Sequence, residues 1–428
     1  MNILIKNAMI VTMENQESVI KNGYVLIEDG VIKEVNSGKY MGSILGHKII
    51  DGAGCAVLPG FINCHTHAAM TLLRGYGEGL PLMKWLNEKI WPFEAKLNEE
   101  DIYIGSTAGM IEMIKGGTTT FSDMYFMQHV VGKAAIDIGM RGCLGNPIIG
   151  EVWEKQLEET VKIYEMFKDN PLIIPMVAPH SPYTCSETTL ESVGELARKY
   201  RMPVHVHISE TEDETNIIKN KYNMTSTMLC ERKGLFNGNK VLAAHCVHVT
   251  DEDIDILAKN EITAVHNPQS NMKLASGAAP IVKMIKNGVN VAIGTDGASS
   301  NNNLNMIEEM QTASLLQKLV TKDATALGAY ETLRLATVNA AKAIGMDGIL
   351  GMIKKGYAAD IIMMDISRPH MVPIHDIYSN IVFSAQGSDV KTVIINGRIV
   401  MEDRRIKGID EGEIIKKVSS VVENILKR

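Results

Sequence analysis

PGFINCHTH, residues 59–67, is an apolar run that ends in two histidines. Successive side chains of a strand point to opposite faces, so His65 and His67 share one face and can hold one ion together. This spacing alone is a weak signal, because His205 and His207 repeat it. Three later segments strengthen it, since each places a His, Glu or Asp at the carboxyl end of an apolar run: HVHISET, VLAAHCVH and VAIGTDG. Parallel barrels build their active sites at the carboxyl ends of their strands, so the pattern predicts an α/β barrel enzyme.

The bulk properties agree with one large barrel and a small appendage in a chain of 428 residues. A net charge of -7 without any basic run argues against nucleic acid or an acidic membrane surface as a partner. No apolar run approaches the ~20 residues that span a bilayer, and the first residues do not resemble a signal peptide. The six cysteines form no CxxC pair, which argues against disulfides and sulfur-ligated zinc. We therefore expect a reduced, cytoplasmic enzyme.

The middle of the chain, residues 59–349, alternates strand-like runs with helical stretches such as TLESVGELARKY. Runs rich in Val, Ile and Ala are typical of buried parallel strands. The runs are LPGFINCHTH, GTTTFSDMY, RGCLGNPII, LIIPMVAPHSPY, PVHVHISE, VLAAHCVHV, ITAVHNPQS and NVAIGTDG. Eight βα units predict a closed (β/α)₈ TIM barrel.

Both ends of the chain have a different pattern, with short strands broken by turns. In residues 1–58, Asp29-Gly30 predicts a hairpin, and in residues 350–428 Asn396-Gly397 predicts another. We expect the two ends to meet and form one small β-sandwich, followed by a terminal helix.

Five side chains at the ends of predicted strands could form a metal centre. They are His65, His67, His207, His245 and Asp296. Any one of these histidines would ordinarily be a hydrogen-bonded core residue, but the same placement at several strand ends makes coincidence a poor explanation. Imidazole and carboxylate donors suit zinc, and iron or manganese would accept the same set.

PGFINCHTH, HVHISET and GTDG together resemble the amidohydrolase superfamily, in its deaminase and chlorohydrolase branch, and the resemblance extends over essentially the whole chain. It implies a barrel with a split β-sandwich, and it makes His65, His67, His207 and Asp296 the metal ligands. His245 corresponds to a residue beside the metal-bound water, which in some members is itself a ligand.

Other residues are interpreted against the same family pattern. His205 lies one inward layer below His207 and is expected to support the ligands, and His248 is expected to be structural. Members with two metals bridge them with a carboxylated lysine from the fourth strand. LIIPMVAPHSPY contains no lysine, so we expect one metal ion per subunit.

The predicted chemistry is hydrolytic. Zinc with an open position lowers the pKa of its bound water from about 15.7 to ~7, which supplies hydroxide at neutral pH. Asp296 is placed to accept the water's proton, and the resemblance makes Glu210 the group that shuttles a proton to the substrate ring. The alternative for Glu210 is a carboxylate stabilised at a helix N-terminus, since acidic residues continue in ETEDET. Signatures of cytidine-type deaminases, P-loops and GxSxG hydrolases do not occur.

Within the superfamily the chain resembles the methylthioadenosine/S-adenosylhomocysteine deaminases most, on the segments LLRGYGEGLPLMKWLNEKIWPFEAKL and APHSPYTCS. The resemblance implies that Glu94 accepts both ribose hydroxyls and that His180 reaches the nucleoside. Charge-assisted hydrogen bonds to a carboxylate, worth about 1.5–3 kcal/mol each, suit a vicinal diol. Trp85 and Met83 could cover the 5′ side of the sugar, although ordinary helix packing explains them, and Trp91, equally well.

One departure from the family concerns the 5′ group. After the third strand the family commonly has arginines that meet the nucleoside and the amino-acid carboxylate of S-adenosylhomocysteine. This chain has RGCLGNPIIGEVWEKQ, with Arg141 before the strand and Asn146 where an arginine is often found, so we expect Asn146 to contact the substrate there. A buried carboxylate without a partner is costly. We therefore expect better turnover of neutral 5′ groups, as in methylthioadenosine, 5′-deoxyadenosine or adenosine, than of S-adenosylhomocysteine.

Two other functions remain open at this point. The first is deamination or dechlorination of another ring, such as guanine, pterin, cytosine or a triazine. The second is a metal-stabilised binding or scaffold protein, which would not need Glu210 beside an open metal. Dimers or tetramers are usual for such barrels, but no interface for a homo-oligomer can be identified in the sequence.

Overall fold

Two parallel four-stranded sheets form the centre of the computed structural model, which describes residues 2–428. The strand order is β10-β8-β7-β6 in one sheet and β12-β13-β14-β15 in the other. The first sheet contains β6 (Phe61–Thr66), β7 (Thr118–Met124), β8 (Arg141–Gly145) and β10 (Ile173–Pro175). The second contains β12 (Val204–Ile208), β13 (Val241–His245), β14 (Thr263–His266) and β15 (Asn290–Ile293). Each of the eight predicted runs therefore contains a strand, and nearly every residue in these strands is buried, as expected for parallel sheets covered on both faces.

Backbone hydrogen bonds join the two sheets at their outer edges. Val177, just beyond β10, forms a parallel bridge with Val204 of β12. At the other edge, the N–H of Asp296 donates to the carbonyl of His65 in β6 over 2.9 Å. A further pair of short strands, β9 (Pro147–Ile148) and β11 (Ala178–Pro179), extends the pairing beyond β8 and β10.

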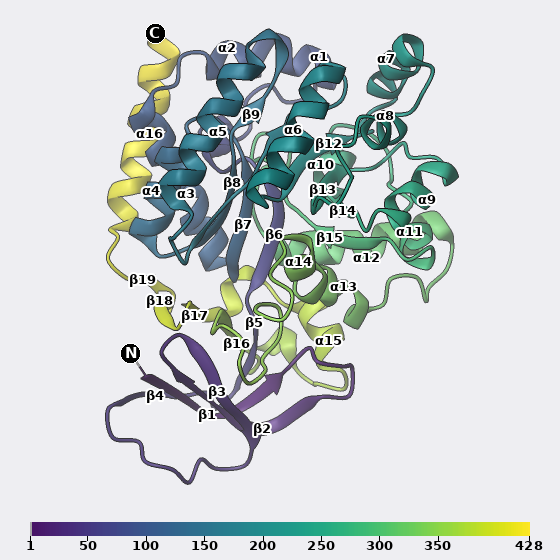
Figure 1. Cartoon of the computed structure of the whole chain (residues 1–428). Coiled ribbons are helices and arrows are strands. Elements are labelled where there is room, and N and C mark those ends of the chain that lie inside the picture. Colours follow the sequence, from purple (N-terminus) through teal and green to yellow (C-terminus); the bar gives the residue numbers. More distant parts are fainter. Residues whose placement is uncertain (1) are drawn as a thin grey trace.

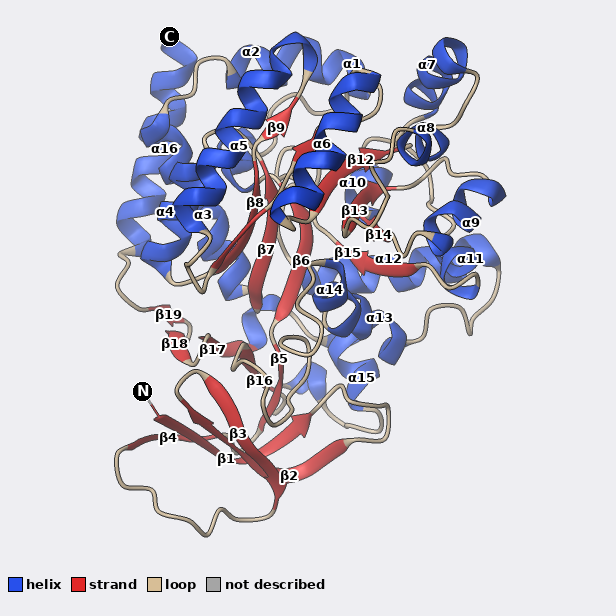
Figure 2. Cartoon of the chain, viewed as in Figure 1, coloured by secondary structure: helices blue, strands red, loops and turns tan. Residues whose placement is uncertain are grey.

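Helices surround the central strands (Figure 2). They are α3 (Glu99–Lys115), α4 (Gln128–Ile138), α5 (Trp153–Phe167), α6 (Glu187–Tyr200), α7 (Glu212–Tyr222), α8 (Ser226–Arg232), α9 (Asp251–Lys259), α10 (Pro268–Lys273), α11 (Ile281–Lys286), α12 (Met306–Thr321), α13 (Ala329–Leu335) and α14 (Val338–Ala343). The helix predicted for TLESVGELARKY is α6, which is confirmed. Its hydroxyl cap is Ser186, and Leu190, Val193 and Ala197 form its buried stripe at helical spacing.

A chain of short helices between β6 and α3 covers the carboxyl end of the first sheet. It consists of η1 (Ala68–Leu73), α1 (Leu82–Trp85), η2 (Leu86–Ile90) and α2 (Trp91–Glu94). This segment contains two of the predicted substrate-binding residues, Trp85 and Glu94.

Strands from both ends of the chain share one nine-stranded sheet at the lower end of the molecule in Figure 1. Its order is β19-β18-β17-β16-β5-β1-β2-β3, and β4 pairs with β1. These strands are β1 (Asn2–Val11), β2 (Val19–Glu28), β3 (Val31–Ser37), β4 (His47–Asp51), β5 (Cys55–Pro59), β16 (Ile361–Asp365), β17 (Val390–Ile395), β18 (Arg398–Glu402) and β19 (Arg405–Ile406). Strands from the two ends of the chain therefore pair directly within one sheet. The second sheet of the expected β-sandwich and the three predicted domain boundaries stay predictions.

Both predicted hairpins of this sheet are confirmed. Asp29-Gly30 joins the antiparallel strands β2 and β3, and Asn396-Gly397 joins β17 and β18. All four of these turn residues have positive φ, which Asn, Asp and Gly tolerate best.

The expected terminal helix is α16 (Glu411–Lys427), which packs beside α3 (Figure 1). Arg428 fixes its end by pairing with the buried Asp101 of α3 over 2.6 Å. The remaining elements are short helices: η3 (Gly150–Val152), η4 (Pro369–Met371), α15 (Ile377–Ser379), η5 (Asn380–Ser384) and η6 (Gly387–Asp389). Within residues 2–428, none of the helices has both the length and the apolar character that crossing a membrane requires.

Candidate active site

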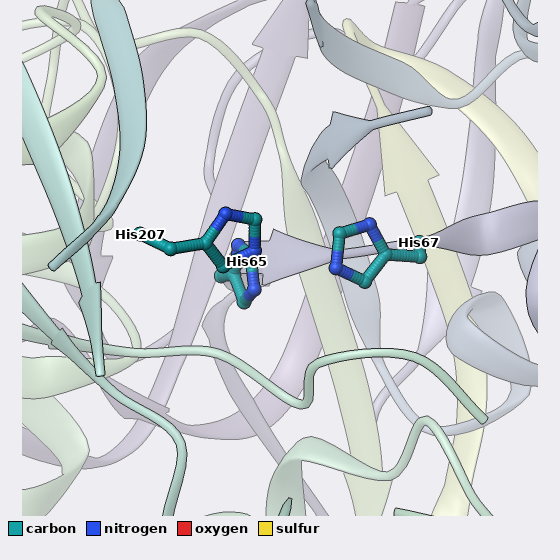
Figure 3. A group of neighbouring side chains, drawn as sticks. All are labelled: His65, His67 and His207. Carbon is teal, nitrogen blue, oxygen red and sulfur yellow. The ribbon is translucent and has the colours of Figure 1, made fainter. Parts of the chain in front are cut away.

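Three imidazoles from distant parts of the chain converge at the carboxyl ends of the central strands (Figure 3). His65 belongs to β6, His67 follows that strand directly, and His207 belongs to β12. The rings of His67 and His207 are nearly parallel, with centroids 5.6 Å apart, and the ring of His65 stands perpendicular to both at 4.9 Å. One ligand atom from each lies within 4.8 Å of the others, and the same holds for the group His65, His245 and Asp296.

A second contact fixes the orientation of each ring. The Nδ1 of His67 donates to the carbonyl of Met124, and the Nδ1 of His207 donates to the carbonyl of His180, both over 2.6 Å. The Nδ1 of His65 lies 2.8 Å from Nε2 of His205. These contacts leave the Nε2 atoms of the three rings available, which is the usual arrangement around a bound metal ion. His205, two residues before His207 in β12, thus contacts the ring of His65.

Asp296 contributes a carboxylate to the same centre, three residues beyond the end of β15. Its Oδ1 lies 3.2 Å from Nε2 of His67 and 3.4 Å from Nε2 of His65. Its Oδ2 accepts the hydroxyls of Ser270 and Ser300 over 2.6 and 2.8 Å. Burial opposes ionisation, but the two neighbouring imidazoles hold the pKa of Asp296 well below its usual value. Oδ1 is therefore a negative donor aimed at the imidazoles.

The state of these groups fits a divalent cation. Within the described part of the chain, the buried Nε2 of His65 has no hydrogen-bond partner, although orphaned buried polar atoms are rare. Burial lowers the pKa of His65 to about 4 and that of His207 well below its ordinary value, so both rings are neutral. Neutral imidazole is the form that ligates metals. Together with the carboxylate of Asp296, these rings make a nitrogen and oxygen donor set for a divalent metal.

Glu210 and His245 lie together beside this centre. Oε2 of Glu210 is 3.8 Å from Nε2 of His245, whose Nδ1 donates to Oδ1 of Asn271 over 2.9 Å. Glu210 precedes Thr211, the capping residue of α7, so it is not part of the first helical turn. Glu210 therefore lies in the turn between β12 and α7 rather than within the helix. Burial raises the pKa of the Glu210 carboxyl, as suits a group that accepts and returns a proton.

The centre opens into a cavity with ≈ 850 Å³ of empty space, including its mouth. Its lining includes five residues of the centre described above: His67, His207, His245, Glu210 and Asp296. Of the residues predicted to contact substrate, Glu94, His180 and Trp85 line the cavity, and Trp91 does so too. The remaining lining includes apolar side chains such as Leu82, Leu86 and Ile90. A concave, largely apolar pocket with a few convergent polar groups is typical of a small-molecule site.

Tyr125 is a residue of the cavity that the sequence analysis missed. Its hydroxyl donates to Oε1 of Glu94 over 2.7 Å. Burial raises the pKa of Glu94 to about 7, although the bond from Tyr125 favours the carboxylate. The available signal was that this tyrosine ends the strand-like run GTTTFSDMY, where rim residues are expected.

Some singled-out residues lie away from the cavity lining. Asn146 uses its side chain elsewhere, accepting the N–H of Gln128 at 3.2 Å and donating to Glu159 at 3.4 Å. Met83 is not among the lining side chains. His248 donates to the carbonyl of Ser276 over 2.7 Å.

Arg141 does not lie before the third strand, as predicted, but within it. This arginine is the first residue of β8 rather than a residue before the strand, and it forms two bonds of 2.9 and 3.0 Å to the buried carboxylate of Asp360. The ion pair between Arg141 of β8 and Asp360, the residue before β16, therefore joins the central strands to the terminal sheet.

Comparisons with known proteins agree with this geometry. Residues 56–400 match the model of the Amidohydrolase family. The chain is 52% identical over 99% of both chains to a 5-methylthioadenosine/S-adenosylhomocysteine deaminase of Clostridium tetani, and 44% identical to a 5′-deoxyadenosine deaminase of Methanosarcina acetivorans over 100% of this chain and 99% of that one. The crystal structure of an adenosine deaminase from Xanthomonas campestris with bound zinc superposes with a TM-score of 0.95 at 33% identity, covering 100% of this chain and 99% of that one. The chain therefore belongs to the amidohydrolase family.

Proposed function

We propose that the protein is a hydrolytic deaminase of adenosine-type nucleosides, which converts the 6-amino purine and water into the inosine analogue and ammonia. The observation that favours it most is the position of Glu210, 3.8 Å from His245 beside the metal centre, in a cavity that Glu94 also lines. Names of relatives at 44–52% identity agree with adenosine-type substrates.

We infer that the metal is zinc, with one ion per subunit held by His65, His67, His207 and Asp296. The Xanthomonas relative contains zinc, and these donors suit it. When bound, zinc would supply a Lewis acid that lowers the pKa of water toward neutrality.

The protein's own groups then move the protons. Asp296 accepts a proton from the attacking water through Oδ1, while Ser270 and Ser300 hold Oδ2. Glu210, in its protonated form, transfers its proton to the ring nitrogen next to the carbon under attack, so that this carbon becomes electrophilic. The amino group on that carbon then takes the proton that Asp296 accepted and leaves as ammonia, while the new hydroxyl becomes the carbonyl and returns its proton to Glu210. His245, oriented by Asn271, holds the water on the face from which it attacks. Such acid–base catalysis is worth about 10²–10⁴ in rate.

The cavity lining beyond the metal centre would hold the nucleoside. In this proposal Glu94, oriented by Tyr125, accepts the two ribose hydroxyls, and His180 contacts the nucleoside from beside His207. Trp85, which is 6% exposed, would lie against the sugar.

The fold supports the assignment. We infer that the two central sheets close into one (β/α)₈ barrel, because backbone bonds join them at both edges. The terminal sheet would then be the small β domain of the family, and the active site would lie on the barrel rim, where such enzymes place their catalytic residues.

The lining also bears on the 5′ substituent. No lysine or arginine is among the residues of the described chain that line the cavity. Lys273 lines a neighbouring hollow, where Glu78 pairs with it over 2.9 Å. A free carboxylate on the substrate would therefore lack a cationic partner, which favours neutral 5′ groups.

Ammonia release from zinc-loaded protein tests the proposal. Adenosine, 5′-deoxyadenosine and methylthioadenosine should be deaminated, whereas guanine, cytosine and aminated triazines should react far more slowly. Glu210→Gln should retain the metal and lose at least about 10²-fold in kcat. Preference for a free base or a triazine would replace the proposal with another ring chemistry, and full activity of Glu210→Gln would indicate a different mechanism.

A further inference from the structure

Glu214, in the first turn of α7, has a buried carboxylate that the mechanism above does not use. It is 4% exposed. Oε1 accepts the N–H of Ser209 over 2.9 Å, and Oε2 accepts the N–H of Glu210 over 2.8 Å. The hydroxyl of Ser226 donates a third bond, over 3.0 Å. The carboxylate thus binds both peptide N–H groups on the N-terminal side of the Glu210 side chain.

These bonds differ from ordinary helix capping. In a capping box, the acidic residue at the third helical position reaches back to the N–H of the capping residue itself. Helix α9 shows that arrangement, with Asp253 bonded to the N–H of Thr250. In α7 the capping residue is Thr211, but Glu214 reaches past it to the two residues before it. The bonds therefore fix the segment that contains Glu210 rather than the helix end.

The backbone at this point needs such support. Ser209 has φ of +52°, a left-handed conformation that costs a non-glycine residue about 1 kcal/mol or more. Its carbonyl accepts the N–H groups of Val247 and His248, just after β13, over 3.0 and 2.9 Å. His245, at the end of β13, also has a left-handed backbone, with φ of +73°. The turns bearing Glu210 and His245 are thus bonded to each other, and Glu214 fixes one of them.

We propose that Glu214 is a positioning residue that holds the Glu210 carboxylate against His245 for proton transfer, without touching the substrate itself. The inference rests on the proposed function, since it gives Glu210 its role. It extends that function by assigning a residue outside the cavity to the catalytic step.

Glu214→Gln tests the proposal with almost unchanged shape. The amide can accept only one of the two N–H groups, and its own NH₂ opposes the other donor. We expect kcat for adenosine to fall at least about tenfold. This loss is smaller than the factor of about 10²–10⁴ that acid–base catalysis contributes, because Glu210 is displaced rather than removed. KM and zinc content should stay within about twofold, because neither the nucleoside site nor the ligands change.

Asp101→Asn is the control. It removes a buried carboxylate that caps α3 by accepting the N–H of Asn98 over 3.0 Å and that pairs with Arg428 at the end of the terminal helix, and it should lower the melting temperature without lowering kcat. The double variant Glu210→Gln/Glu214→Gln gives a second readout. If Glu214 acts only through Glu210, the double variant should be no slower than Glu210→Gln alone, whereas independent structural damage would multiply the two losses.

Three kinetic and metal-content results would overturn the inference: multiplied losses in the double variant, an unchanged kcat in Glu214→Gln, or a loss of activity that tracks a loss of zinc. A crystal structure of Glu214→Gln keeps the test independent of the proposed activity. The separation of Glu210 from His245, 3.8 Å in the wild-type chain, should increase. If the wild-type protein released no ammonia, the proposed function would fail, and an unmoved Glu210 in that crystal structure would separately reject the positioning role.

Discussion

The hydroxyl of Ser270 donates to Oδ2 of Asp296 over 2.6 Å, on the side of the carboxylate opposite the histidines. Ser300 donates to the same oxygen over 2.8 Å. Two donors on Oδ2 prevent the carboxylate from rotating, so Oδ1 stays aimed at His65 and His67. Supporting contacts of this kind determine how well a metal site holds its ion.

Ser270→Ala should therefore weaken metal binding. We expect zinc affinity to fall about 10–100-fold, as is usual when a partner behind a metal ligand is removed. Competition with a zinc chelator measures this directly. Ser314→Ala is the control, because Ser314 has an equally buried hydroxyl that bonds to the carbonyl of Leu327 in a different region. Equal zinc affinities for the two variants would show that Asp296 needs no such support.

Tyr125→Phe should affect binding more than chemistry. The variant removes the hydroxyl that orients Glu94 and leaves the metal centre unchanged. We expect KM for adenosine to rise about threefold to tenfold, which corresponds to the ~0.5–1.5 kcal/mol net value of a hydrogen bond, with kcat nearly unchanged. Tyr103→Phe, which loses a hydroxyl bonded to Asp137 at the surface, should leave KM unchanged. A fall in kcat at constant KM would place Tyr125 in the chemical step instead.

The buried Glu94 should make nucleoside binding depend on pH. Burial raises the pKa of Glu94 to about 7, so the carboxylate, which in the proposed function accepts the ribose hydroxyls, is lost as the pH falls through that value. KM for adenosine should rise roughly tenfold for each pH unit below this pKa and level off above it. A nucleoside without the 2′ and 3′ hydroxyls is the control, since its weaker binding should not follow this titration. A KM for adenosine that stays constant across the range would contradict the role of Glu94.

Much of the metal centre follows from local sequence rules. The two-residue spacing of His65 and His67 implies one shared face wherever the segment is extended, and apolar runs before polar residues locate the strand ends. The same locality explains the hairpins at Asp29-Gly30 and Asn396-Gly397, whose turn chemistry needs no distant partner. These features were predictable because each depends on neighbours in the chain.

The supporting contacts could not be predicted, because they depend on tertiary packing. Ser270 meets Asp296 only after two strand ends converge, and Tyr125 meets Glu94 across two different connections. Arg141 finds Asp360 at a separation of 219 residues. Asn146 illustrates the converse problem. The family pattern placed it at the substrate, but its amide satisfies the backbone N–H of Gln128 instead.

The 5′ substituent of the nucleoside should separate good substrates from poor ones. Because the cavity lining lacks a lysine or arginine within the described chain and Arg141 is paired with Asp360, a carboxylate near the 5′ position would lose its hydration without gaining a partner. We expect kcat/KM for methylthioadenosine to exceed that for S-adenosylhomocysteine by at least about tenfold, equivalent to ~1.4 kcal/mol. The methyl ester of S-adenosylhomocysteine is the matched control, since it keeps the length and the ammonium group but has no free carboxylate, and it should recover much of the difference. Equal efficiency for the free acid and methylthioadenosine would mean that a cationic group reaches the 5′ end, and Lys273, released from Glu78, would then be the first side chain to test.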